Sequence, residues 1–168
     1  DLVDRSERIK LDGRSFPNGV HLAEVEIDPE TGALVLDRYS VVDDFGVLVA
    51  PNLVEGQVHG GIAQGFGQAV TEWLVQDDGG QVITASFMDY GMPRAADLPF
   101  ISFAERGIPT RTNPLGMKGC GEAGTVGALG AISNAVREAL APLGVRQVDM
   151  PFTPNRIWGW IEAAKQGA

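Results

Sequence analysis

One carboxylate, Glu122, stands inside a run of glycines where it could act as a general base. Residues 113–128 read Asn-Pro-Leu-Gly-Met-Lys-Gly-Cys-Gly-Glu-Ala-Gly-Thr-Val-Gly-Ala, and apolar residues follow at helical spacing. A helix beginning here places Glu122 near unpaired backbone N–H groups and the positive end of the helix dipole. Each glycine costs a helix about 1 kcal/mol relative to alanine, so this many indicates that something bulky closely approaches the backbone. The run could bind an anionic ligand and hold a base beside it.

The glycine run can also be interpreted in other ways than as a site for an anionic ligand beside a base. The stretch from Gly119 to Gly124 fits G-x-G-x-x-G, but a dinucleotide fingerprint follows a hydrophobic strand, and 111–118 is a turn-rich loop. No Gly-Lys-Ser/Thr closes the run, which argues against a P-loop. On this motif alone, glycines for tight helix packing, with Glu122 as a solvated cap, explain the pattern about as well as a binding site does.

A second glycine-rich segment favours the site. Residues 54–74 carry five glycines among apolar residues at helical spacing, which predicts a helix near 55–75 with a core-facing stripe. The stripe comprises Val58, Ile62, Phe66, Val70 and Trp73 or Leu74. Gln64, within this segment, offers a donor pair and an acceptor on one planar group, which suits recognition of an oxo group or a heterocycle edge.

Together these segments resemble the C-terminal part of the large, molybdopterin-binding subunit of the molybdenum hydroxylases. This family includes xanthine dehydrogenase, aldehyde oxidoreductase and aerobic carbon monoxide dehydrogenase. The likeness consists of seven short runs in the family's order and spacing, at 16–21, 24–32, 54–65, 85–90, 93–99, 113–124 and 153–158. One departure is Ala50, where many family members have Asn before the proline, so the hydrogen bonds of that amide are lost or replaced here.

The resemblance implies a mechanism and a set of site residues. Glu122 takes the position of the base beside the molybdenum, and Gln64 that of the glutamine contacting the cofactor near the metal. Five further residues are expected to help bind molybdopterin: Gly61, Gly65, Lys118, Gly119 and Gly121. No protein ligand to the metal is expected, because the cofactor's dithiolene holds it.

The resemblance also implies the reaction and the partners. The expected reaction is oxidative hydroxylation of an aldehyde, an N-heterocycle or CO, by an oxidoreductase in the cytoplasm. Iron–sulfur clusters and FAD are expected on companion subunits or domains, and the rest of the cofactor site on the upstream region of the same large subunit. The alternative is a non-catalytic assembly or interaction module that retained the scaffold.

Composition narrows the class of protein. The 168 residues suit one domain, and 13 Lys plus Arg against 22 Asp plus Glu argue against nucleic-acid binding. No apolar run approaches the roughly 20 residues of a membrane span. Cys120 is the only cysteine, which excludes disulfide scaffolds and protein-ligated iron–sulfur clusters within this chain. It is expected to be a small buried residue in a tight loop.

The order of elements predicts an α+β fold, a two-layer α/β sandwich with a mixed sheet and two long helices. Strands are expected at 20–27, 33–43, 82–86, 100–105 and 145–149, the second long helix at 122–140, and a short helix after Thr153-Pro154. His21 is expected to be a surface or packing residue. The acidic pairs at 43–44 and 77–78 are expected in solvated turns.

The chain starts at Asp1 without a methionine, which together with the resemblance favours a fragment. Residues 1–19 are expected to be a linker from an upstream domain, and 20–168 a C-terminal cofactor-binding subdomain. The isolated fragment is expected to be inactive and without stably bound cofactor, because it forms only one wall of the site.

Overall fold

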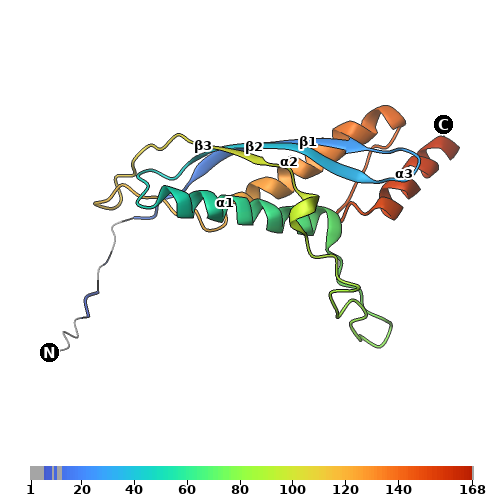
Figure 1. Cartoon of the computed structure of the whole chain (residues 1–168), viewed down its shortest axis with the longest axis horizontal. Helices are drawn as coiled ribbons and strands as arrows, with labels where there is room; N and C mark the ends of the chain where they lie inside the picture. Colours follow the sequence, from blue (N-terminus) through green and yellow to red (C-terminus); the bar gives the residue numbers. More distant parts are fainter. Residues whose placement is uncertain (1–5, 9, 11–12, 168) are drawn as a thin grey trace.

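A three-stranded sheet lies over two long helices in the computed structural model, which describes residues 6–8, 10 and 13–167 (Figure 1). Strand β1 (Asn18–Ile27) pairs antiparallel with β2 (Leu34–Asp44), and β2 pairs in parallel with β3 (Ile101–Glu105). Helices α1 (Pro51–Phe66) and α2 (Ala123–Leu140) cover one face of the sheet (Figure 1). The predicted α+β sandwich with a mixed sheet is confirmed.

A β-bulge decides which side chains of β2 face the helices. Glu24 pairs with Arg38 and Val25 with Leu36, so Asp37 is the extra residue on β2. An extra residue reverses the in–out alternation of a strand. Consequently Leu36 faces the core before the bulge, whereas Tyr39, Val41 and Asp43 face it afterwards.

The apolar core lies between the sheet and the helices. It contains the buried stripe of α1 and the buried residues of α2, which recur at four-residue spacing: Ala128, Ile132, Val136 and Leu140. Helix α3 (Pro154–Gln166) adds Ile157 and Ile161 to the same core. Pro154 at the first turn of α3, after Thr153 at the N-cap position, agrees with the predicted start of this helix, although the Thr153 side chain makes no capping hydrogen bond.

Several predicted elements differ in the structure. The helix expected at 55–75 consists of α1 and one π-helical turn, η1 (Gly67–Thr71), so the exposed Trp73 and Leu74 do not belong to its stripe. No strand forms at 82–86, where Val82 makes only an isolated bridge with Gln76, and none forms at 145–149. Short apolar runs become strands only where another strand pairs with them, and in these two runs the one pairing is that isolated bridge.

The turn prediction holds for one acidic pair and fails for the other. The exposed Asp77 accepts backbone hydrogen bonds from Gly79 and Gln81, as expected for a turn residue. Asp43 and Asp44, by contrast, close strand β2, and Asp43 is only 2% exposed. The cause is the bulge, which turns Asp43 toward the helices.

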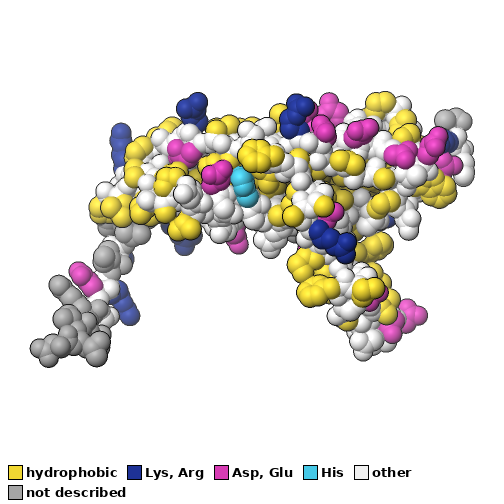
Figure 2. Space-filling model, viewed as in Figure 1, with side chains coloured by type: hydrophobic (Ala, Val, Ile, Leu, Met, Phe, Trp, Pro, Cys, Tyr) yellow, Lys and Arg dark blue, Asp and Glu magenta, His cyan; other side chains and the backbone are white. Residues whose placement is uncertain are grey.

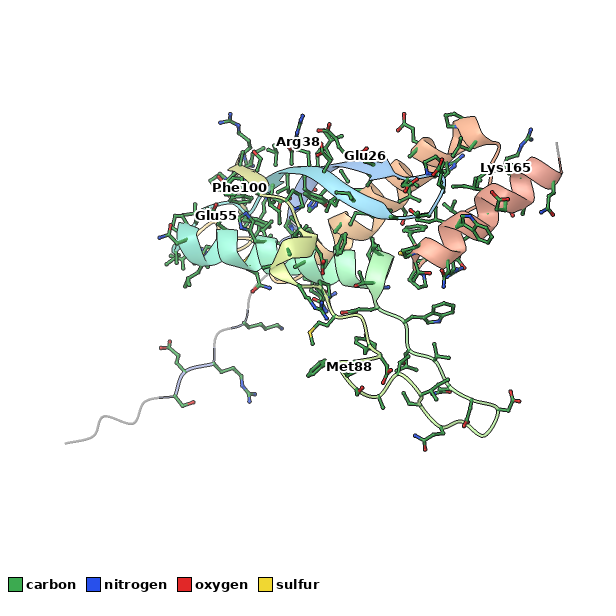
Figure 3. The ribbon with its side chains drawn as sticks, turned by 45° about the vertical axis from the view of Figure 1, so that its right-hand side comes forward. Glu26, Arg38, Glu55, Met88, Phe100 and Lys165 are labelled. Carbon is green, nitrogen blue, oxygen red and sulfur yellow. The ribbon has the colours of Figure 1, made fainter. Side chains whose placement is uncertain are left out.

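Residues 72–94 leave the body of the molecule as an extended arm (Figure 1). Figure 3 shows Met88 on this arm, away from the sheet, and Glu26 and Arg38 on the sheet face opposite the helices. The predicted linker 1–19 lies partly outside the described residues, and its last two residues belong to β1.

Candidate active site

Glu122 immediately precedes α2 and keeps its carboxylate free. Its backbone has φ −117° and ψ 1°, and its side chain is exposed and makes no capping hydrogen bond. The glycines before it leave open space: a Cβ added at Gly119 or Gly121 would meet no atom within 4 Å. Among the described residues, the backbone N–H groups of 119–122 have no hydrogen-bond acceptor. A carboxylate and several free donors therefore lie together at the start of a helix.

Helices α1 and α2 approach each other most closely at glycines. A Cβ on Gly61 would lie 3.0 Å from the Gly124 Cα, and one on Gly65 would lie 2.7 Å from the Ala128 Cβ. Gly61, Gly65 and Gly124 are all buried in this helix crossing. The expected cofactor residues Gly61 and Gly65 thus allow tight helix packing, and through it they set the position of the loop that bears Glu122.

The crossing brings two amide side chains of α1 against the start of α2. The Thr125 hydroxyl donates to the Gly61 carbonyl (3.1 Å) and to Gln64 Oε1 (3.2 Å). Gln57 Nε2 donates to the Gly121 carbonyl (2.7 Å), one residue before Glu122. Gln64 itself is exposed, and its contact Thr125 lies three positions after Glu122 in the chain, so α1 places Gln64 beside the first turn of α2.

A cavity of about 550 Å³ opens beside Glu122. Its α2 side is lined by Gly119, Gly121, Glu122, Ala123, Val126 and Gly127. Its sheet side is lined by Pro17, Asn18, Gly19, His21 and Asp43. Gln64 lies outside this lining, beside Thr125. The cavity is therefore bounded by two carboxylates, a histidine and the open glycine loop.

The sheet wall of the cavity contains a buried polar chain that the sequence did not reveal. His21 Nδ1 lies 2.7 Å from the Tyr39 hydroxyl, and His21 Nε2 lies 3.5 Å from Asp43 Oδ1. Burial, and secondarily the charge of Asp43, raises the pKa of Tyr39, which keeps its hydroxyl protonated. The Tyr39 hydroxyl and Nδ1 share one hydrogen bond, and the tautomer with its proton on Nε2 would turn that proton toward Asp43. His21 is thus a packing residue, as expected, but a hydrogen-bonded one.

Two glycines make room for the buried side chains of His21 and Asp43. A Cβ on Gly127 of α2 would collide with the His21 ring, and a Cβ on Gly19 would collide with the Asp43 carboxylate. Gly19 pairs directly with Asp43 across β1 and β2. In the sequence, this site is marked by Gly19 and Gly127 together with His21 and Asp43, and their relation can be recognised only when the strand register is known.

Lys118, which was expected to help bind the cofactor, is held by an ion pair beside the glycine loop. Its ammonium forms a salt bridge with Asp44, and its side chain is only 10% exposed. The hydrogen bond from Lys118, and then that from the Ile108 N–H, lowers the pKa of Asp44 to about 2. Because the Lys118 N–H also donates to the Phe45 carbonyl (2.8 Å), this residue anchors the glycine loop to the end of β2. Cys120, in the same loop, is half-buried.

Comparison with known proteins identifies the family. Residues 3–99 match the family model described as a molybdopterin cofactor-binding domain. The chain is 38% identical over 142 residues to the nicotine 6-hydroxylase large subunit of Paenarthrobacter nicotinovorans, covering 84% of this chain and 17% of that protein. The chain spans about a fifth of the length of the curated relatives it matches.

Solved structures agree with this match. The Cu,Mo-CO dehydrogenase in its carbon monoxide reduced state superposes with a TM-score of 0.85 at 34% identity, over 90% of this chain and 19% of that one. Quinoline 2-oxidoreductase from Pseudomonas putida 86 superposes with a TM-score of 0.83 at 40% identity, over 86% of this chain and 18% of that one.

The chain belongs to the molybdenum hydroxylase large-subunit family, and its matched region is a molybdopterin-binding domain. The relatives are oxidoreductases, several of them named as the large subunit or large chain of a complex. These matches do not favour the non-catalytic module. In the described part of the chain, no helix is both long and apolar enough to cross a membrane.

Proposed function

We propose that this chain forms one wall of the molybdenum-cofactor site of an oxidative hydroxylase and supplies its general base, Glu122. The observation that carries this proposal is the free carboxylate of Glu122, at the mouth of a cavity and beside unpaired backbone N–H groups. A general base must be accessible to the proton it removes. Glu122 meets this condition, because no side chain or backbone donor of the described chain occupies its carboxylate.

The residues present fit molybdopterin. The open space at Gly119 and Gly121 lets a large planar group approach the backbone, where free N–H groups can donate to its polar edge. The exposed Gln64 amide, against Thr125 in the first turn of α2, provides a further donor. When bound, the cofactor would supply the oxidising molybdenum centre that accepts two electrons from the substrate.

The residues of this chain would carry out proton transfer and positioning. Glu122 accepts the proton of the oxygen nucleophile that attacks an electron-poor carbon, and Gln64 orients the cofactor. Lys118 fixes the glycine loop through Asp44, while Gly61 and Gly65 fix the crossing of α1 and α2. The substrate class remains an aldehyde, an N-heterocycle or CO, because the cavity wall formed by this chain does not distinguish them.

The projecting arm supports a role within a larger subunit. Its apolar side chains are exposed, Met88 at 92% and Phe87 at 77%, and Figure 2 shows hydrophobic side chains along it. Exposed apolar clusters of this kind mark interaction surfaces. We expect the arm to pack against the rest of the large subunit, with iron–sulfur and flavin centres on companion subunits or domains, in the cytoplasm.

The test is Glu122→Gln in the complete large subunit with its companions. This change keeps shape and hydrogen bonding but removes the base, whose contribution is typically about 10²–10⁴-fold. We expect a loss of turnover at or above the top of that range, with molybdenum content near wild type. Glu138→Gln, on the exposed part of α2 far from the cavity, is the matched control.

Turnover and molybdenum must be measured on the same sample. A fully loaded Glu122→Gln enzyme that keeps more than about a tenth of its activity has lost less than ~1.4 kcal/mol of barrier stabilisation, and Glu122 is then not the base.

A further inference from the structure

Asp43 has one carboxylate oxygen without a hydrogen-bond donor. The side chain is 2% exposed, and its Oδ2 has no partner among the described residues. His21 lies on the Oδ1 side and at 3.5 Å, and therefore does not satisfy Oδ2. A buried carboxylate without donors is unfavourable, and native proteins almost always supply a partner. Asp43 also belongs to the cavity wall beside Glu122, so a donor that entered the cavity would come against this side chain.

The charge around the cavity decides what kind of partner fits. The lining contains two carboxylates, those of Asp43 and Glu122, and no lysine or arginine. The nearest basic residue in sequence, Lys118, has its ammonium engaged by Asp44. The only titratable nitrogen in the lining is His21, whose ring is already placed between Tyr39 and Asp43. Around Asp43, on the sheet side of the cavity, the field therefore favours a positively charged donor.

We propose that the sheet wall of this cavity, with Asp43 at its base and His21 and Tyr39 behind it, binds an N–H-bearing cation. The ligand class is an ammonium, amidinium or guanidinium group, which donates to Asp43 while its apolar part rests on Val126 and Ala123. The group can come from a small molecule or from a basic side chain elsewhere in the protein. The site stands apart from the base role of Glu122, because its evidence is the unpaired Asp43 oxygen.

Nuclear magnetic resonance on the isotopically labelled chain tests this site directly. Methylammonium and guanidinium chloride, at concentrations well below denaturing, are titrated while the Asp43 carboxyl carbon and the His21 ring nitrogens are observed. Tetramethylammonium chloride at equal ionic strength is the matched probe, since it carries the same charge without N–H donors. We expect saturable shifts at Asp43 and His21, with affinity for the N–H cations about 10- to 100-fold above that for tetramethylammonium, the range of one charge-assisted hydrogen bond.

Variants separate the site from general surface effects. Asp43→Asn should abolish the saturable shifts at His21, whereas Asp37→Asn, at the exposed bulge of β2, should leave them unchanged. If Asp43→Asn does not fold, the comparison of the N–H cations with tetramethylammonium on the wild-type chain still tests whether the site binds an N–H-bearing cation. Equal responses to tetramethylammonium, or shifts that do not saturate, would overturn the proposal.

A second experiment identifies the source of the cation. The same titration is repeated on the complete large subunit. Continued saturable binding assigns the site to the amine or amidine group of a small molecule. An Asp43 signal that is already at its cation-bound position and no longer responds assigns it to a basic side chain of the subunit. An unresponsive signal at the cation-free position contradicts the site in the assembled protein. Loss of activity in Glu122→Gln bears on none of these outcomes.

Discussion

Two glycines of α2 should respond in opposite directions to the same substitution. A Cβ on Gly124 would meet the Val58 carbonyl and the Ile62 nitrogen, at 2.9 Å for the latter. These are backbone atoms of α1, which cannot rotate away as a side chain would. A Cβ on Gly130, in the same helix, would meet nothing within 4 Å. An alanine side chain therefore clashes with α1 at position 124 and fits without contact at position 130.

The magnitudes follow from the two effects of alanine. Overpacking costs about 1–3 kcal/mol, and rigid backbone neighbours place Gly124→Ala at the upper end. Alanine also favours a helix over glycine by up to about 1 kcal/mol. We expect Gly124→Ala to lower the free energy of unfolding by about 2 kcal/mol and Gly130→Ala to raise it by up to about 1 kcal/mol. For a domain of this size, these values correspond to melting temperatures about 4–8 °C lower and about 2–4 °C higher.

Urea denaturation followed by circular dichroism measures both variants. Heating scans on the same samples check the temperatures. If Gly124→Ala is as stable as wild type, the close helix crossing that positions Gln64 and the Glu122 loop is wrong. If Gly130→Ala is strongly destabilising, α2 has an unrecognised neighbour at that position.

Further predictions concern the polar contacts and the cofactor. Because the pKa of Asp44 is lowered in the folded protein, its ionised form stabilises the fold fully above the ordinary carboxyl pKa near 3.8, and this stabilisation is lost as the pH falls toward about 2. The free energy of unfolding, measured between pH 5 and 2, should show this loss, and the pH-dependent loss should be smaller in Asp44→Asn. Tyr39→Phe removes the hydrogen bond to His21 Nδ1 and should cost about 1–3 kcal/mol in urea denaturation; an unchanged midpoint would refute a stabilising role for this bond. The isolated 168-residue chain should fold but retain no stoichiometric molybdenum after gentle purification, and metal analysis showing one molybdenum per chain would refute the one-wall account.

The elements that could be predicted from sequence are those with a strong local pattern. The two strands expected at 20–27 and 33–43, the long helix expected at 122–140 and the proline at the start of α3 all appear close to where the sequence places them, although the exposed Val126 is not part of the buried stripe of α2. Local periodicity and turn chemistry suffice for such elements. The short runs at 82–86 and 145–149 looked like strands, but strand formation needs an edge to pair with, which local sequence does not contain.

The candidate site was predictable on its helix side only. Glu122 and Gln64 stand in glycine-rich runs that attract attention, and the structure places Glu122 directly before α2 and Gln64 against Thr125 in the first turn of that helix. The sheet wall depends on a bulge at Asp37, which moves Asp43 from an apparent turn into the core. A register shift of one residue exchanges the two faces of a strand, and no single-sequence pattern marks where it occurs.

The location of the molybdenum tests the central claim most directly. Crystals of the cofactor-loaded large subunit, measured above and below the molybdenum absorption edge, give the metal position independently of the surrounding density. We expect an anomalous peak within direct or one-water hydrogen-bond reach of the Glu122 carboxylate, roughly 3–6 Å, on the open side of the loop formed by residues 119–122. A peak outside that reach, with Glu122 facing bulk solvent, would contradict it.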